Sequence, residues 1–297
     1  MSAVKWKAGV TRYAKPTELE QALALLGEGS WRILAGGTDF YPALGNRPLR
    51  ENVLDINGLS ALRGIAERDN HWSIGSRTAW TDLIGHELPP AFDALKQAAR
   101  EVGSQQIQNV ASIAGNLCNA SPAADGAPAL MVLGSEVELR SAASTRYLPL
   151  EAFILGNRRT ALQPNEMVTA IRVPKAAATG RSAFVKLGAR RYLVISIAMA
   201  AARFVIENGI VAEASIAVGS CSAVAVRLAG LESLLLGKSV RELPDIVRDA
   251  SIDELSPIDD VRGTALYRRD AAREIVSRAM LSATGLDSAE IAAGMVA

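Results

Sequence analysis

Cysteine and histidine are scarce in this chain of 297 residues, which holds only Cys118, Cys221, His71 and His86 of these two types. An iron–sulfur cluster usually needs four cysteine thiolates, and a zinc site needs three or four close ligands. By itself the chain offers neither a cysteine-ligated cluster nor a Cys/His zinc site, so we predict no metal ligands. Free cysteine is commonly buried, and we expect both cysteines to be small apolar residues of the core.

Excess charge of one sign and long apolar runs are missing as well. The 32 basic residues nearly balance the 31 acidic ones, and no lysine- or arginine-rich block occurs, which argues against nucleic acid as a partner. No apolar segment approaches the roughly 20 residues that span a bilayer. The stretch Met1–Lys7 lacks the apolar run of a signal peptide, so we expect a cytoplasmic protein with no membrane span.

Apolar residues make up 49% of the chain, enough for a substantial core, and the length allows two domains. Apolar patterns predict short strands at 31–35, 53–56, 71–76, 136–140 and 166–173, and helices at 91–102, 127–133, 227–236 and 270–281. We expect a domain boundary at Pro174–Gly180. Beyond it, Asn208-Gly209 between two apolar runs predicts a β-hairpin, so the last domain is a small antiparallel sheet packed with helices.

Two glycine-rich loops, Ile33–Phe40 and Val110–Asn116, are the most informative feature that is present. Glycine lets the backbone approach a ligand closely, and successive N–H groups can form a concavity that suits a pyrophosphate. A glycine-rich turn on its own is usually only a turn. The first loop lacks the remaining glycines of G-x-G-x-x-G and the lysine of a P-loop, which disfavours a Rossmann or Walker-type site. Two such loops suggest one large nucleotide held from both sides.

The segment Ala111–Asp125 resembles the second flavin-binding signature of the FAD subunits in the molybdenum hydroxylase family, and Ala35–Asp39 is similar to the first. This family includes the medium subunits of carbon monoxide dehydrogenase and of bacterial xanthine dehydrogenase-like enzymes. Further segments resemble the family in the right order along the chain, namely Phe153–Thr160, Glu166, Ile171–Pro174, Phe184–Arg191 and Tyr267-Arg268. Ala114 departs from the pattern, because the family usually has glycine there; its methyl group fits only if its φ is negative.

The resemblance implies an α+β fold. A two-part FAD-binding domain of the vanillyl-alcohol-oxidase-like or CO dehydrogenase flavoprotein type would occupy residues 1–175, with subdomains at about 1–57 and 58–175. A CO dehydrogenase flavoprotein-like C-terminal domain, the antiparallel sheet with helices, would follow at 181–297.

The resemblance also implies which residues bind FAD. The first loop would wrap the pyrophosphate and approach the flavin ring, while Ser112 and Asn116 would contact the phosphates or ribityl chain from the opposite side. Asp125 would bind a ribose or nearby hydroxyl, and Lys186 would lie near the isoalloxazine edge. The implied set is Ile33, Leu34, Ala35, Gly36, Gly37, Thr38, Asp39, Phe40, Ala111, Ser112, Ala114, Gly115, Asn116, Asp125, Met167, Val168 and Lys186.

Simpler roles remain open for several of these residues. Thr38 and Asp39 readily stabilise turns, and Asp125 can instead cap the helix that follows it. Lys186 can be a solvated lysine on a strand. Tyr192 is a possible ring-stacking residue, for which ordinary packing is the alternative.

By this resemblance the chain is an FAD-binding electron-transfer subunit of a heteromeric molybdenum hydroxylase. A small subunit with [2Fe–2S] clusters would pass electrons to its FAD, which would deliver them to NAD, oxygen or a quinone. A large subunit would carry molybdopterin, in a dimer of heterotrimers. Neither histidine has an evident catalytic partner, so we name no catalytic residue, since the chemistry would be the cofactor's. The alternatives are a self-sufficient flavin oxidoreductase and a non-redox subunit that has lost FAD.

Overall fold

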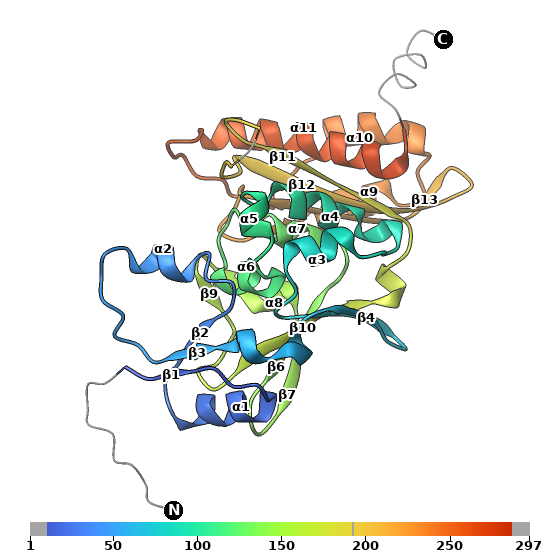
Figure 1. Ribbon diagram of the computed structural model, residues 1–297. Helices are drawn as coiled ribbons and strands as arrows, with labels where there is room; N and C mark the ends of the chain where they lie inside the picture. The colour runs from blue at the N-terminus through green and yellow to red at the C-terminus, as the bar shows by residue number, and fades with distance from the viewer. Residues whose placement is uncertain (1–10, 192, 287–297) are drawn as a thin grey trace, which may run out of the picture.

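The N-terminal subdomain is a small parallel sheet with one helix across it. The computed structural model describes residues 11–191 and 193–286. Its first strands are β1 (Tyr13–Ala14), β2 (Arg32–Leu34) and β3 (Val53–Asp55), in the order β1-β3-β2. Helix α1 (Leu19–Glu28) buries Ala22, Leu23 and Leu26 against this sheet because their spacing places them on one helical face. The short helix α2 (Phe40–Leu44) follows β2 (Figure 1).

The second subdomain is built on a five-stranded antiparallel sheet. Its order is β4 (Ile65–Glu67), β5 (His71–Gly75), β10 (Met167–Pro174), β6 (Glu136–Arg140) and β7 (Thr145–Pro149). Its helices are α3 (Trp80–Gly85), α4 (Asp93–Glu101), α5 (Gln105–Gln108), α6 (Ile113–Asn119), α7 (Gly126–Met131) and α8 (Leu150–Phe153). A separate two-stranded hairpin joins β8 (Ile154–Gly156) to β9 (Arg159–Thr160).

The C-terminal domain is an antiparallel sheet in simple sequential order. It consists of β11 (Arg181–Leu187), β12 (Ala198–Glu207), β13 (Ile210–Gly219) and β14 (Val226–Arg227), with helices α9 (Ala229–Leu235), α10 (Leu243–Asp249) and α11 (Ala265–Thr284). The predicted hairpin turn is confirmed: Asn208 and Gly209 both have positive φ, which suits the twist of a two-residue turn. The expected α+β class is confirmed too.

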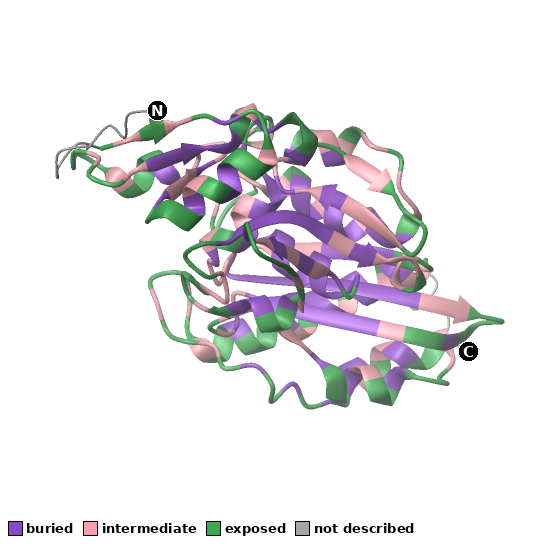
Figure 2. Ribbon diagram, turned by 90° about the horizontal axis from the view of Figure 1, so that it is seen from below, coloured by how far each residue is buried: buried purple, intermediate pink, exposed green. Residues whose placement is uncertain are grey.

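The C-terminal sheet is buried on both faces. Strand β12 contributes the run Ala198–Ala202, in which every residue except Met199 is alanine. Met199 and Ala201 belong to the core of the second subdomain, under α4 and α7, while Ala200 faces the core under α11. The small side chains let helices approach the strand from either side. Figure 2 shows the long central strands as buried over much of their length, and pink and green toward the hairpin end. The two domains therefore share a hydrophobic core.

Two negative findings concern only residues 11–191 and 193–286. No helix in these ranges combines the length and apolarity needed to cross a bilayer. The same ranges hold no cluster of three or more His, Cys, Asp or Glu side chains placed to bind a metal ion. Tyr192 and the stretch Met1–Lys7, singled out in the sequence, lie outside them.

Candidate functional site

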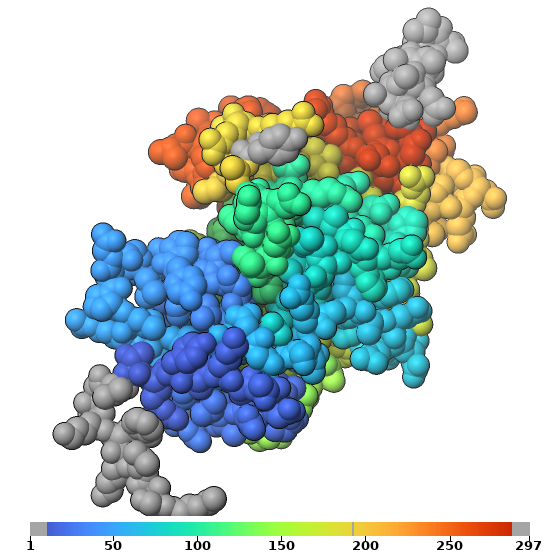
Figure 3. Space-filling view, in the orientation of Figure 1, coloured from blue at the N-terminus to red at the C-terminus, as the bar shows by residue number. Residues whose placement is uncertain are grey.

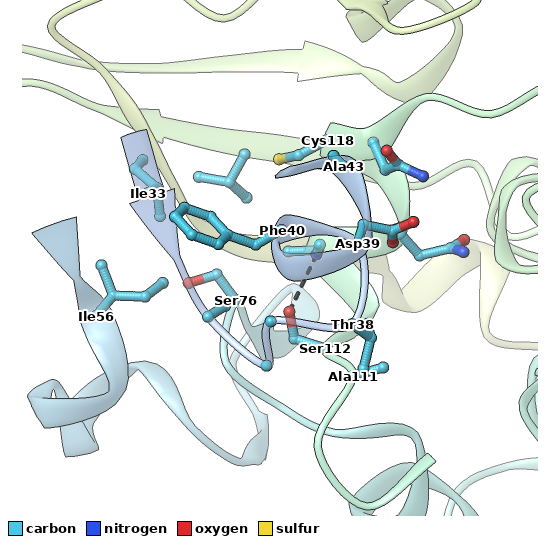
Figure 4. Close-up of a pocket in the computed structure, with 18 of the residues that line it drawn as sticks. Ile33, Thr38, Asp39, Phe40, Ala43, Ile56, Ser76, Ala111, Ser112 and Cys118 are labelled. Atoms are coloured by element: carbon cyan, nitrogen blue, oxygen red, sulfur yellow. Dashed lines mark hydrogen bonds between the residues drawn. The ribbon is translucent and has the colours of Figure 1, made fainter. Parts of the chain in front are cut away.

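A cavity of about 460 Å³ lies between the N-terminal subdomain and the second subdomain, within the usual size range of cofactor pockets. Both glycine loops line it, although they are about 75 residues apart along the chain (Figure 4). Of the residues predicted to bind FAD, the structure brings these into the wall: Ile33, Ala35, Gly36, Gly37, Thr38, Asp39, Phe40, Ala111, Ser112, Ala114, Gly115, Asn116, Met167 and Val168. Figure 3 shows the blue N-terminal segment against the green middle of the molecule on one face.

The first loop connects the end of β2 to α2 and presses against the second. A Cβ atom added to Gly36 would stand 1.9 Å from the carbonyl oxygen of Val110, so only glycine allows this approach. Gly37 has φ +77, in the left-handed region that favours glycine. Neither Thr38 nor Asp39 uses its side chain in a hydrogen bond within the described residues, and Asp39 does not cap α2. Both polar groups are available to a ligand.

The second loop is shorter than predicted, because its latter half is the first turn of α6. Ser112 is the N-cap of this helix, and its Oγ accepts a hydrogen bond of 3.1 Å from the N–H of Gly115. The hydroxyl can still donate to a ligand. Ala114 lies inside the helix without a positive φ and is buried, so its departure from the family's glycine is accommodated.

Three polar atoms in residues that line the cavity are buried and have no hydrogen-bond partner: Ser76 Oγ, Trp80 Nε1 and Asn116 Oδ1. Leaving a buried donor or acceptor unpaired costs free energy, so native structures rarely keep one without a reason. FAD is rich in hydroxyl, carbonyl and ring nitrogen groups, which are the kinds of partner that such atoms lack. With the glycine cradle and apolar side chains such as Ile56, this donor and acceptor set fits FAD.

Three residues of the predicted set do not line the cavity. Leu34 points into a small core with Phe40 and Val53. Asp125 and Lys186 form a buried ion pair, with 2.7 Å between Nζ and Oδ2, in which the side chains are 9% and 6% exposed.

Other bonds fix this ion pair in place. The Ser196 hydroxyl donates to Asp125 Oδ1 at 2.7 Å, and Lys186 Nζ also donates to the Glu101 carbonyl. Burial raises the pKa of Asp125, against the opposing effect of Lys186. Two simpler roles are wrong as a result: Asp125 makes no cap bond to α7, and Lys186 is not a solvated lysine.

Sequence reasoning missed several residues of the wall. Ser76 was predicted as the last residue of a strand and directly follows β5, and Trp80 was not among the residues predicted to bind FAD. The expectation for the cysteines is confirmed for Cys221, which is buried, and wrong for Cys118. Cys118 is exposed and lines the cavity (Figure 4), because α6 turns that face toward the ligand space rather than the core.

Comparison with known proteins agrees with this geometry. Residues 8–176 match the FAD binding domain in molybdopterin dehydrogenase, and residues 183–283 match the CO dehydrogenase flavoprotein C-terminal domain. The carbon monoxide dehydrogenase medium chain of Hydrogenophaga pseudoflava is 31% identical, covering 91% of this chain and 96% of that protein. The nicotinate dehydrogenase FAD-subunit of Eubacterium barkeri is 29% identical over 89% of this chain and 92% of its own length.

Solved structures give the same result. The chain superposes on carbon monoxide dehydrogenase from Hydrogenophaga pseudoflava with a TM-score of 0.82 and 29% identity, covering 95% of this chain and 100% of that one. The matched domains define a flavoprotein subunit of the molybdopterin dehydrogenase class. More narrowly, this chain belongs to the family of FAD-binding medium subunits of molybdenum hydroxylases. It is an oxidoreductase subunit, and its cofactor is FAD.

Proposed function

We propose that this chain carries electrons, through FAD bound in the cavity, from the [2Fe–2S] clusters of a small partner subunit to NAD, oxygen or a quinone. The observation that carries this proposal is the cavity with its two facing glycine loops and three unpaired buried polar atoms. When bound, FAD supplies one- and two-electron exchange that the protein's own side chains lack. With only two cysteines, the chain needs another subunit to hold the clusters.

The residues of the cavity would bind and orient the cofactor. The backbone at Gly36 and Gly37 would approach the pyrophosphate, and Ser112 would donate a hydrogen bond from the other side. Met167 and Val168, at the start of β10, would make apolar contact with the adenine or the flavin ring. Asp125 and Lys186 stay in the proposed set. To contact the ribose and the ring edge of FAD, these two side chains would have to give up their bond to each other.

We propose that the chain assembles with a small [2Fe–2S] subunit and a large molybdopterin subunit as a dimer of heterotrimers in the cytoplasm. Names of relatives support this arrangement, because a medium chain implies a larger and a smaller one. These relatives act in dehydrogenases of carbon monoxide, glyceraldehyde and nicotinate, which suggests that a partner subunit determines the substrate.

We place the junction of the two domains, 1–175 and 181–297, in the segment 176–180.

Purification of the native complex on a tag attached to this chain tests the proposal. We expect a yellow protein that brings down iron- and molybdenum-containing partners, detected by absorbance spectroscopy and metal analysis, with an untagged strain as the control. An isolated chain that oxidises a substrate without partners would instead indicate a self-sufficient oxidoreductase. A chain that stays colourless after incubation with FAD would indicate a subunit that has lost the cofactor.

A further inference from the structure

The charges around the cavity are unevenly compensated. Among the described residues that line it, the Lys, Arg, Asp and Glu side chains are Arg32, Asp39 and Arg158. Arg32 is already occupied, since its Nη1 lies 2.9 Å from Glu51 Oε2 and its guanidinium stacks 4.4 Å from the centre of the Phe40 ring. Asp39 has the same sign as a phosphate. A dinucleotide pyrophosphate is anionic, so a cation beside it would add a charge-assisted contact to those of the backbone N–H groups, and neither of these two residues supplies one.

Arg158 is the remaining cation of the wall. It lies between β8 and β9, and its Nη1 donates to Asn119 Oδ1 at 2.6 Å. Asn119, at the end of α6, also lines the cavity. Within residues 11–191 and 193–286, no carboxylate oxygen lies within ion-pair distance of this guanidinium. Arg158 therefore has a positive charge held beside a neutral amide, with no anion to balance it.

The backbone holds Arg158 in a costly conformation. Its φ is +54, in the left-handed region, where a residue other than glycine gives up roughly 1–2 kcal/mol. Its N–H donates to the carbonyl of Ala120 at 2.9 Å, and Ala120 is itself the left-handed C-cap of α6. A glycine at this turn would avoid the strain but carry no charge. A tight hairpin turn requires this left-handed backbone, as at Asn208, so the turn itself fixes where the Arg158 side chain begins.

We propose that Arg158 is a cofactor-binding residue, which supplies the positive charge that balances the pyrophosphate of FAD, and that Asn119 orients its guanidinium. The inference rests on FAD occupying this cavity. Its neighbour Arg159 provides a matched comparison, because Arg159 is also exposed on the same hairpin but does not line the cavity.

The test measures FAD affinity of the full chain after removal of FAD, at low and high salt, for wild type, Arg158→Gln, Arg158→Lys and Arg159→Gln. A charge-assisted contact predicts that Arg158→Gln weakens FAD binding about tenfold or more at low salt. The FAD affinity of Arg158→Gln should also depend less on salt concentration than that of wild type, because this variant lacks the contact between the guanidinium and the pyrophosphate. Arg158→Lys should keep the salt dependence and recover part of the affinity, while Arg159→Gln should match wild type.

Melting temperatures of the FAD-free variants separate this role from a structural one. We expect Arg158→Gln to melt close to wild type without FAD. Unchanged FAD affinity in Arg158→Gln would overturn the inference, and so would weaker binding with the salt dependence of wild type. A wild-type chain that binds no FAD would instead count against the proposed function.

Discussion

At the scale of single residues, the site depends on atoms that the protein leaves unpaired. Ser76 is 3% exposed, yet its hydroxyl has no partner. Ser182 is equally buried, but its hydroxyl donates to the Ala91 carbonyl at 2.7 Å and accepts from the N–H of Ala94 at 2.9 Å. The fold thus supplies hydrogen-bond partners for the hydroxyl of Ser182 but none for the hydroxyl of Ser76.

This difference predicts opposite effects of one substitution. Ser76→Ala removes an unsatisfied buried group, so we expect the FAD-free chain to gain about 1 kcal/mol of stability and FAD to bind several-fold more weakly. Ser182→Ala should lower stability by about 1 kcal/mol and leave FAD affinity unchanged. Denaturant unfolding without FAD and a fluorescence titration with FAD measure the two quantities. A loss of stability in Ser76→Ala would show that its hydroxyl is satisfied without FAD.

Gly36 is the residue at which the two loops meet most closely. In Gly36→Ala the new Cβ would collide with backbone at Val110, which cannot move aside as a flexible side chain can. We therefore expect the loops to separate and FAD affinity to fall at least tenfold. Gly27→Ala is the control, because nothing lies within 4 Å of the added Cβ and alanine is the better helix former inside α1. Equal FAD content in the two purified variants would mean that loop contact does not shape the site.

At the scale of elements, an ion pair joins β7 to the residue just before β10, whose first residues line the cavity. Glu166, 4% exposed, accepts two hydrogen bonds of 2.7 Å from Arg146 on β7. It also accepts from the N–H of Gln163. These bonds fix the segment that leads into Met167 and Val168, so the wall near the start of β10 depends on them.

The pair also predicts how stability depends on pH. Hydrogen bonding from Arg146 holds the pKa of Glu166 below its usual value of about 4.3. Its stabilising contribution is therefore fully present above that value and is lost as pH falls through the lowered pKa of the folded state. We expect Glu166→Gln to cost about 2 kcal/mol at pH 7, and progressively less as the solution becomes more acidic.

Unfolding free energies of wild type and Glu166→Gln between pH 7 and pH 3 test this. Glu136→Gln is the matched control, because its contact with Arg172 is longer, at 3.5 Å, and more exposed, so its effect should be small. A difference between wild type and Glu166→Gln that stays constant down to pH 3 would contradict the assigned role of the carboxylate.

Elements with a clear apolar pattern were predictable, and those that depend on distant contacts were not. The strand predicted at 136–140 is β6 to the residue, and the strand predicted at 166–173 is β10 within one residue. Strand β7 escaped prediction because it is an edge strand with exposed residues and a terminal proline. Helix α6 was taken for loop because its small residues and glycine lack helical periodicity, and its N-cap at Ser112 is the only local signal.

The candidate site shows the same contrast between features with a local sequence signal and features that depend on distant contacts. Both glycine loops could be named from local composition and family resemblance, and the structure brings both to one cavity. The Lys186–Asp125 pair could not be foreseen, because it joins residues 61 positions apart across the domain junction. Arg158 lies in a segment that resembles the family, but nothing in that segment marked it as a cofactor ligand, since an arginine in a turn is usually solvated. Only the fold shows that its turn meets the end of α6.

At the scale of the whole molecule, the two domains are joined by more than their shared core. Arg203, on β12, donates to the carbonyl of Val132 at 3.0 Å, and the N–H of Phe184 donates to Gln97 Oε1 at 2.7 Å. Phe184 and Met199 lie in the same apolar cluster as α4 and α7. Neither domain can separate without exposing this cluster, so we expect the chain to unfold cooperatively.

Cooperative unfolding predicts that damage far from the cavity lowers the temperature at which FAD is released. Val247, 2% exposed on α10, packs in the core under α11, on the side of the C-terminal sheet away from the FAD-binding domain. Val247→Ala should cost about 2 kcal/mol and lower the FAD-release temperature as much as the loss of helical circular dichroism. Arg248→Ala, an exposed neighbour, should shift neither. If only the circular dichroism transition moved in Val247→Ala, while FAD release stayed at the wild-type temperature, the domains would be independent units.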